Sequence, residues 1–459
     1  MKPTRRDLLR CSACGLLGRA AFISGFDRFS MVSAMASPLT DYKALVCIFM
    51  FGGNDSNNML VPNDTAGYQN YSTKRGVLAL SQSSLLTIGP KSGGNYGLHP
   101  NMTSLQPLFT TVRTGQLAPP LAIVCNVGTL NAPINKQQYL AGTSRPYQLF
   151  SHSDQQNQWQ TGVSSSDVTA GWGGRIADAI DVTSGFPTVC SVAGVSVFSV
   201  GTKTQPIALS PAPTPLNQTL RLLQPDPNNV LQKVLTGDQS SLTPTLINAS
   251  DNITQYAINN SALLSSNPIL KTAFPATGLG NQLLQVAKLI SLNSTLGLKR
   301  QIFFCSIGGF DTHTVQLNTQ KNLLQQLGDA MAAFYQATVE LQVSSDVTTF
   351  TLSDFSRTFV PAGTDPTTVG SDHAWGSHQL VMGDAVKGGD LYGIFPDLLV
   401  GQSQDADTGA GARGRWIPST AVDQYASTLA QWYGLSSTDL SAIFPNINLF
   451  SKSDLGFMM

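Results

Sequence analysis

The stretch QIFFCSIGGFDTHTVQ, residues 301–316, decides the fold expected for this chain. Its first part, residues 302–307, is an apolar run of strand length that is rich in β-forming residues. Two glycines follow and allow a sharp turn, and then come Asp311 and His313. In open α/β sheets, ligand-binding residues lie just beyond the carboxyl ends of the strands. The stretch therefore predicts a buried strand that delivers a carboxylate and an imidazole to the carboxyl edge of a sheet.

Two other apolar runs end in the same way. Residues 44–51 lead into Gly52-Gly53-Asn54-Asp55, and residues 347–352 lead into Ser353-Asp354. After residue 316, leucine, methionine and phenylalanine recur at three- and four-residue spacing, which predicts an amphipathic helix. Alternation of buried strands with such helices favours an α/β fold with a mostly parallel sheet and helices on both faces. We expect one such domain over residues 40–459.

Residues 201–275 differ from the rest of the chain. Six prolines between residues 206 and 227 interrupt a sequence rich in Ser, Thr and Asn. We interpret this stretch as an irregular, proline-rich insertion or cap outside the core sheet.

Composition limits the range of partners. The chain has 459 residues, of which 42% are hydrophobic and only 12% charged, and its formal net charge is zero. Nothing in this balance indicates nucleic acid or anionic lipid as a partner. Beyond the N-terminal region, no segment is apolar over enough residues to predict an integral membrane span.

The N-terminus has the pattern of an export signal. Residues 4–9, TRRDLL, resemble the twin-arginine motif, and Ala34-Met35-Ala36 offers a cleavage site. We therefore predict a twin-arginine signal peptide over residues 1–36 and a periplasmic or extracellular location. An amphipathic N-terminal helix is the alternative. Export by this route implies folding before translocation, which suits a protein with a metal centre.

Four cysteines remain if Cys11 and Cys14 leave with the signal peptide. They lie in apolar, strand-like segments, which favours buried free thiols. A disulfide remains the alternative in an exported protein.

Histidines and aspartates suggest a metal site. Residues 370–378, GSDHAWGSH, form the densest histidine cluster, in a loop punctuated by glycine. Imidazole together with carboxylate is the ligand mixture that zinc, manganese or iron prefers. Enough ligands for two divalent ions would come from Asp55, Asp311, His313, Asp354, Asp372, His373 and His378. Two ions about 4 Å apart can polarise a phosphate or sulfate ester and stabilise its leaving oxygen.

Each of these residues also has a structural interpretation. The aspartates at strand ends are frequent caps of turns and helices, and His373 and His378 can be ordinary loop residues. The metal hypothesis depends on their combination, because three strand ends and one loop converge on one edge if the sheet is parallel.

The chain contains six short motifs in a fixed order: GGND (52–55), LHP (98–100), SH with a following W-x-x-G (151–162), GGFDTH (308–313), SDFSRT (353–358) and DHAWGSH (372–378). The identity and order of these motifs resemble those of the domain of unknown function 1501 family. The resemblance extends over nearly the whole length of the chain. That family is grouped with the alkaline phosphatase and sulfatase superfamily, so the resemblance implies an alkaline phosphatase-like fold and a two-metal site. Asp55, Asp311, His313 and Asp354 match its metal positions, although Asp354-Phe355 stands where the phosphatases have Asp-His.

The resemblance also implies a nucleophile at a helix start. Ser151 and Ser153 fit this position, Ser56 is a further candidate, and each has the alternative of a helix cap. Arg357 would bind the anionic group of a substrate or pair with a nearby aspartate. The sequence thus predicts an exported, metal-dependent hydrolase that acts on a small-molecule or polymer ester of phosphate or a related acid. The rival hypothesis is a non-catalytic envelope binding or assembly protein.

Overall fold

The structure is a computed structural model that describes residues 41–164, 168–180, 186–219, 264 and 266–459. The chain divides into two units, Met1–Asp41 and Tyr42–Met459, and apart from Asp41 the described residues belong to the second. The predicted signal peptide and residues 220–263 of the predicted insertion lie outside the described residues.

A nine-stranded sheet forms the centre of the described part of the chain. Its strands follow the order β11-β5-β10-β9-β1-β8-β6-β7, and β12 pairs with β5. All pairs are parallel except those of β10, which runs antiparallel to both β5 and β9. The strands are β1 (Lys43–Met50), β5 (Leu121–Gly128), β6 (Val189–Ser191), β7 (Ile207–Ala208), β8 (Arg300–Ile307), β9 (Val347–Ser353), β10 (Ser377–Met382), β11 (Leu391–Gly393) and β12 (Thr420–Ala421). The prediction of a mostly parallel sheet is confirmed.

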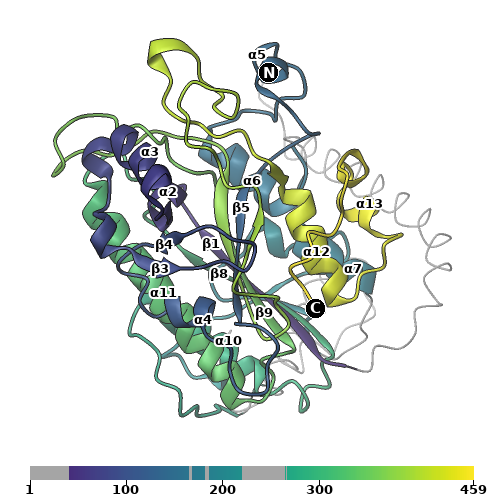
Figure 1. Ribbon diagram of the computed structural model, residues 1–459. Coiled ribbons are helices and arrows are strands. Elements are labelled where there is room, and N and C mark those ends of the chain that lie inside the picture. Colours follow the sequence, from purple (N-terminus) through teal and green to yellow (C-terminus); the bar gives the residue numbers. More distant parts are fainter. Residues whose placement is uncertain (1–40, 165–167, 181–185, 220–263, 265) are drawn as a thin grey trace, which may run out of the picture. The chain divides into compact units, whose positions relative to one another are not determined.

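Helices cover both faces of this sheet (Figure 1). Val46 and Ile48 of β1 belong to the hydrophobic core shared with α10 (Gly278–Ile290) and α11 (Gln316–Glu340). Cys47 and Phe49, which alternate with them, belong to a second core. That core also receives side chains from α6 (His152–Thr161), α7 (Trp172–Ile180) and α12 (Val422–Tyr433). Because strand side chains alternate between faces, one apolar strand supplies both cores.

Shorter elements complete the described fold. A three-stranded sheet has the order β2-β4-β3 and is antiparallel. The remaining elements are β2 (Leu60–Pro62), β3 (Leu86–Ile88), β4 (Tyr96–Leu98), α2 (Ser56–Met59), α3 (Thr65–Arg75), α4 (Gln106–Thr110), α5 (Lys136–Leu140), α13 (Leu440–Ile443) and the 3-10 turns η2 (Gly76–Leu78), η3 (Gln82–Ser84), η4 (Val197–Ser199), η5 (Leu216–Gln218), η6 (Gly409–Gly411) and η7 (Ile447–Leu449).

The strand register brings the predicted strand ends together. Met50, the last residue of β1, is paired with Ile307 of β8 on one side and with Ser353 of β9 on the other. All three carboxyl ends therefore lie in one row. Because β10 runs in the opposite direction, the loop before Ser377 reaches the same edge of the sheet. This arrangement explains why residues so far apart along the chain share one site.

The beginning of the predicted insertion belongs to the sheet, contrary to expectation. β7 pairs in parallel with β6 at the end of the strand order, and Ile207 and Leu209 are buried in the core. Pro206 and Pro211 flank the strand, and an edge strand tolerates proline because one side makes no ladder hydrogen bonds. The high proline content of this stretch is therefore the reason that the short edge strand β7 was not predicted.

The four cysteines in the described residues are free and buried, as predicted: Cys47, Cys125, Cys190 and Cys305. In the same part of the chain, no helix has the length and apolar character that crossing a membrane requires.

Candidate metal centre

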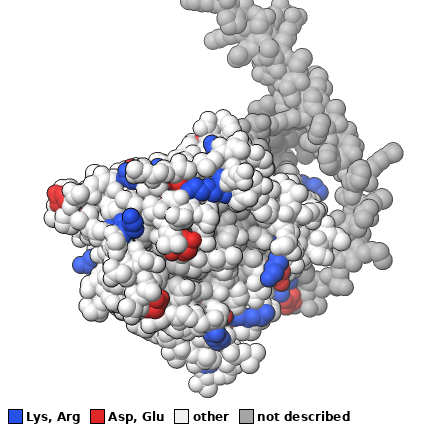
Figure 2. All heavy atoms as spheres, turned by 45° about the horizontal axis from the view of Figure 1, so that its top comes forward, with Lys and Arg blue, Asp and Glu red and all other residues white. Residues whose placement is uncertain are grey.

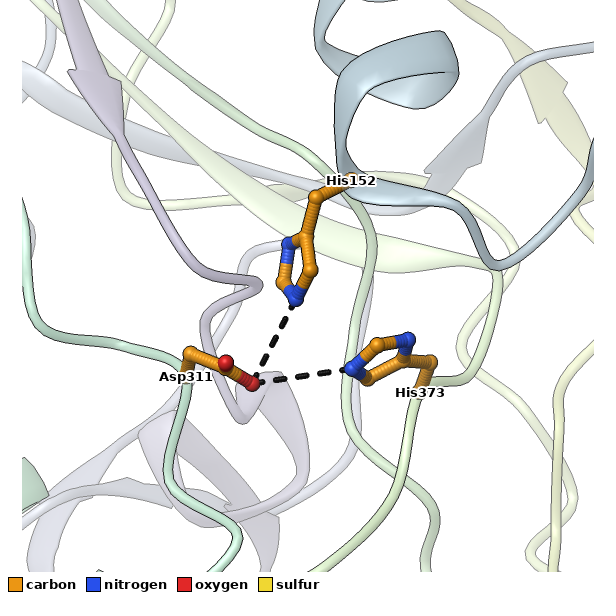
Figure 3. A group of neighbouring side chains, drawn as sticks. All are labelled: His152, Asp311 and His373. Carbon is orange, nitrogen blue, oxygen red and sulfur yellow. Dashed lines mark ion pairs between the residues drawn. The ribbon is translucent and has the colours of Figure 1, made fainter.

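Three side chains from distant parts of the sequence point toward one another at the carboxyl edge of the sheet (Figure 3). His152 is the first residue of α6, Asp311 follows β8, and His373 precedes β10. The Nε2 atoms of His152 and His373 lie 3.4 Å and 3.6 Å from Oδ1 of Asp311. One ligand atom from each of the three residues lies within 4.8 Å of the other two.

His313 adds a third imidazole to this group. Its Nε2 atom lies 3.1 Å from Oδ1 of Asp311 and 3.0 Å from Nε2 of His373. Zinc bonds of roughly 2.0–2.1 Å in a tetrahedral site place the ligand atoms about 3.3 Å from one another. The four separations, from 3.0 to 3.6 Å, lie around that value. We call His152, Asp311, His313 and His373 the metal-type cluster.

The opposite ring nitrogens of the three histidines each face an acceptor. These Nδ1 contacts are His152 to Oδ2 of Asp354 at 2.7 Å, His373 to the Phe150 carbonyl at 2.7 Å, and His313 to Oδ1 of Asp372 at 3.5 Å. A carbonyl or carboxylate that accepts from Nδ1–H leaves Nε2 with its lone pair. The rings are thus oriented as metal-bound histidines usually are.

Asp354 supports His152 from beneath the cluster. Its side chain has no solvent exposure, and its oxygens accept from the Gly52 backbone N–H at 3.2 Å and from Nε2 of Gln156 at 2.8 Å. The strand-end position was predicted, but the carboxylate contacts Nδ1 of His152, the ring nitrogen opposite the one that faces Asp311. Phe355 follows and packs against the rings of His152 and His373, with centroids 4.8 Å and 4.6 Å away. Asp354 therefore supports the candidate ligand His152.

His152 is the cluster residue that sequence reasoning missed as a ligand. No apolar run of strand length directly precedes His152. The search for polar residues just beyond the carboxyl ends of strands therefore did not include it. The end of β5 fixes its helix, because Thr129 Oγ1 donates to Oε1 of Gln155 in the first turns of α6 at 2.7 Å. The signal available in the sequence was the Ser-His pair before W-x-x-G, taken together with a nearby Asp154.

Two glycines allow the loops of the site to touch through their backbones. A Cβ atom on Gly52 would lie 2.3 Å from the Asp311 nitrogen, and one on Gly370 would lie 2.2 Å from the carbonyl carbon of His313. Such separations are far below van der Waals contact, so any side chain there would separate the loops. The glycines of GGND and of the 370–378 loop are therefore needed for the convergence of the ligands.

Asp55 is not part of the metal-type cluster. It forms an ion pair with Arg75 of α3, and both side chains are fully buried. Nε2 of Gln316 also donates to its Oδ2 at 2.6 Å. Burial raises the pKa of this carboxyl group, and Arg75 opposes the rise. The metal assignment from the sequence is corrected, because the partners found for Asp55 are Arg75 and Gln316 and it lies outside the group of possible ligands formed by His152, Asp311 and His373.

His378 and Asp372 also differ from the prediction. Nδ1 of His378 accepts the Asn126 backbone N–H at 3.0 Å, its ring lies 5.0 Å from that of Phe395, and burial lowers its pKa to about 3. It is a core histidine, since it lies within β10 and not in the loop before it. Asp372 faces Nδ1 of His313 and pairs with Arg413 at 3.2 Å, so it stands behind a ligand as Asp354 does.

Arg357 is committed to Asp311. Its Nη1 donates to Oδ1 of Asp311 at 2.9 Å, and its side chain has no solvent exposure. Of the two roles expected for it, the structure thus shows the aspartate pair. Burial alone would raise the pKa of Asp311, but Arg357 and the neighbouring histidines hold it below its usual value.

The pKa values of the histidines respond to their surroundings in opposite directions. The hydrogen bond to Asp354 raises the pKa of His152, and burial lowers that of His373.

The serines predicted as nucleophiles have other partners in the structure. Oγ of Ser151 donates to Oδ2 of Asp154 at 2.5 Å and lies 3.2 Å from Oγ of Ser153. Ser56 is buried, and its Oγ lies 2.9 Å from that of Ser356. Within the described residues, no hydrogen bond joins any of them to the metal-type cluster. Ser151 instead occupies the N-cap position of α6.

Charged side chains are sparse on the face shown in Figure 2, where Lys and Arg often lie beside Asp or Glu. This agrees with the low charged content of the sequence. The electrostatics of the site therefore depend on local pairs such as Arg357–Asp311 and Arg413–Asp372.

These features define an α/β protein with a metal-type cluster at the carboxyl edge of its sheet. The chain belongs to the family described as "Protein of unknown function (DUF1501)", whose model matches residues 42–406. No curated protein matches it. Among solved structures, the PsFucS1 sulfatase from Pseudoalteromonas sp. is similar with a TM-score of 0.29 and 9% identity, over 80% of this chain and 66% of that one, just under two thirds. A likeness this weak has no bearing on function.

Proposed function

We propose that the protein is a metal-dependent hydrolase of phosphate or related esters, exported by the twin-arginine route to the periplasm or the cell exterior. One observation carries the proposal. The Nε2 atoms of three histidines lie 3.1–3.6 Å from one oxygen of Asp311, which is about the separation of ligand atoms around a tetrahedral zinc ion, while each Nδ1 faces its own acceptor.

The donor set favours one ion. In the described residues, the group whose ligand atoms all lie within 4.8 Å of one another is His152, Asp311 and His373, and His313 contacts two of its members. Asp55 and His378 have their partners outside this group, and Asp354 contacts the opposite ring nitrogen of His152. A set rich in imidazole suits zinc, and also iron or manganese. When bound, such an ion supplies Lewis-acid polarisation of an ester oxygen and lowers the pKa of a water molecule.

The residues around the cluster favour an anionic substrate. Arg415 donates through Nε to the His373 carbonyl and through Nη1 to Asp407, each at 2.8 Å, and Arg413 pairs with Asp372. Both arginine side chains are partly exposed, unlike that of Arg357. Guanidinium groups at the rim of a site attract phosphate and sulfate groups and hold them through paired hydrogen bonds.

The rival function is a non-catalytic binding or assembly role in the cell envelope. One observation favours it: four protein ligands can close a tetrahedral site, and closed sites are typical of structural zinc. Among the described residues, no candidate serine is hydrogen-bonded to the metal-type cluster, which also favours a non-catalytic role.

Metal analysis of the chain purified without a histidine tag tests the proposal. We expect about one zinc, iron or manganese ion per chain, lost in His373→Ala and retained in His99→Gln. His99 is a suitable control because its Nδ1 accepts the Asn101 N–H, outside the cluster. Turnover of phosphomonoesters, phosphodiesters and sulfate esters follows. A metal-free wild-type protein would overturn the proposal, whereas bound metal without turnover would favour the rival.

A further inference from the structure

We propose that His313 is an exchangeable ligand, which leaves the metal-type cluster to free a coordination position, while His152, Asp311 and His373 remain. This inference rests on the metal centre proposed above. It assigns different tasks to three histidines whose Nε2 atoms all lie 3.1–3.6 Å from one oxygen of Asp311.

Solvent exposure separates His313 from the other two rings. The side chain of His313 is 45% exposed, compared with 29% for His152 and 24% for His373. Phe355 packs against both His152 and His373. A ring with more open space around it loses less packing when it rotates away.

The Nδ1 supports differ in the same sense. His152 and His373 have acceptors at 2.7 Å, one of them the fully buried Asp354, whereas Asp372 lies 3.5 Å from His313. The side chain of Asp372 is itself 42% exposed, and its other oxygen, Oδ2, accepts a hydrogen bond from Arg413. Because supports behind a ligand fix its ring orientation, His313 is the least constrained of the three.

The backbone of His313, in contrast, is fixed. The neighbouring Thr314 bridges to Val369, and the Val315 N–H donates to the Thr368 carbonyl at 3.0 Å. Gly370 packs directly against the His313 carbonyl group. Exchange therefore takes place by rotation of one side chain and requires no movement of the loop.

The consequence is a site that can be closed at rest and open in use. Three protein ligands and one free position are the usual arrangement of catalytic zinc, and four protein ligands that of structural zinc. With His313 turned away, His152, Asp311 and His373 would hold the ion and leave one position for an oxygen of an anionic ester. The two arrangements that support opposite functions thus become two states of one site.

Zinc affinity of single variants provides the first test. Removal of a ligand's support costs about 10–100-fold in metal affinity, so loss of a fixed ligand costs more than about 100-fold. We expect that larger loss for His152→Ala and His373→Ala, and a loss within about tenfold for His313→Ala. Competition with a chromophoric chelator measures these values, and thermal melting checks that each variant is folded.

Visible absorption of the cobalt-loaded protein provides the second test, with inorganic phosphate as the probe. Wild type is expected to show a four-coordinate spectrum that phosphate converts into a form close to that of phosphate-treated His313→Ala. The inference is wrong if His313→Ala loses the ion as completely as His152→Ala, or if its affinity and spectrum equal those of wild type. It is equally wrong if phosphate leaves the wild-type spectrum unchanged. A wild-type chain that binds no metal would instead refute the metal centre itself.

Discussion

Nδ1 of His152 lies 2.7 Å from Oδ2 of Asp354, a carboxylate that is completely buried at the end of β9. This contact joins the start of a helix to the end of a central strand, across 202 residues of sequence. It turns Nε2 of His152 toward Asp311. The candidate metal centre therefore depends on a residue that itself offers no ligand atom.

Asp354→Asn is expected to weaken metal binding by about 10–100-fold, because the amide no longer fixes the tautomer and orientation of His152. Zinc competition titration measures the effect. Asp439→Asn serves as the control, since that aspartate precedes α13 and accepts from Oγ of Ser436. Equal affinities in wild type and Asp354→Asn would show that His152 needs no carboxylate support.

Asp55→Ala is expected to destabilise the protein by roughly 3–5 kcal/mol, because it leaves Arg75 charged and unpaired in the interior. Urea unfolding measures the loss, and metal analysis of the folded protein should show an unchanged ion content. A variant of normal stability that binds no metal would restore Asp55 as a ligand and contradict the ion-pair role.

His378→Gln is expected to change how stability depends on pH. Because the folded pKa of His378 is about 3, the unfolded chain takes up a proton first as the pH falls below about 6.5. The stability of wild type relative to the variant should therefore be largest above that pH. It should decrease by about 1.4 kcal/mol per pH unit between about pH 6 and 4. Paired urea titrations at several pH values measure the difference, and a constant difference would contradict the burial of this ring.

Gly370→Ala is expected to weaken both folding and metal binding, because its methyl group would meet the His313 backbone at 2.2 Å. Overpacking of this kind costs typically about 1–3 kcal/mol. Gly308→Ala is the matched control, since a Cβ atom there meets no other atom within 4 Å. Thermal melting and zinc titration of the two variants should separate them. Similar values for both would mean that the loops at residues 312 and 370 do not need close contact.

Much of the fold could be predicted because it depends on local patterns. Apolar runs of strand length, each followed by glycine or serine and an aspartate, marked β1, β8 and β9, and helical periodicity marked α11. A parallel sheet then necessarily places such strand ends along one edge. This rule correctly predicted that Asp311, His313 and His373 lie close together.

The remaining site residues depend on contacts that a linear pattern does not contain. Asp55 and Asp311 look alike in sequence, yet only Asp55 meets Arg75, twenty residues further along. His378 lies five residues after His373, but it falls inside β10, where its side chain packs into the core. Both aspartates pair with an arginine, and tertiary packing decides that Asp311 also faces histidines.

The reversed direction of β10 has a consequence for when the cluster can form. Its ligands come from residues 152, 311, 313 and 373, and the last of them reaches the others only after β10 has inserted between β5 and β9. Contacts that span so much sequence form slowly, because a long loop must close first. We therefore expect tight ion uptake to be a late event in folding, and stopped-flow measurement of zinc capture would time the closing of the sheet.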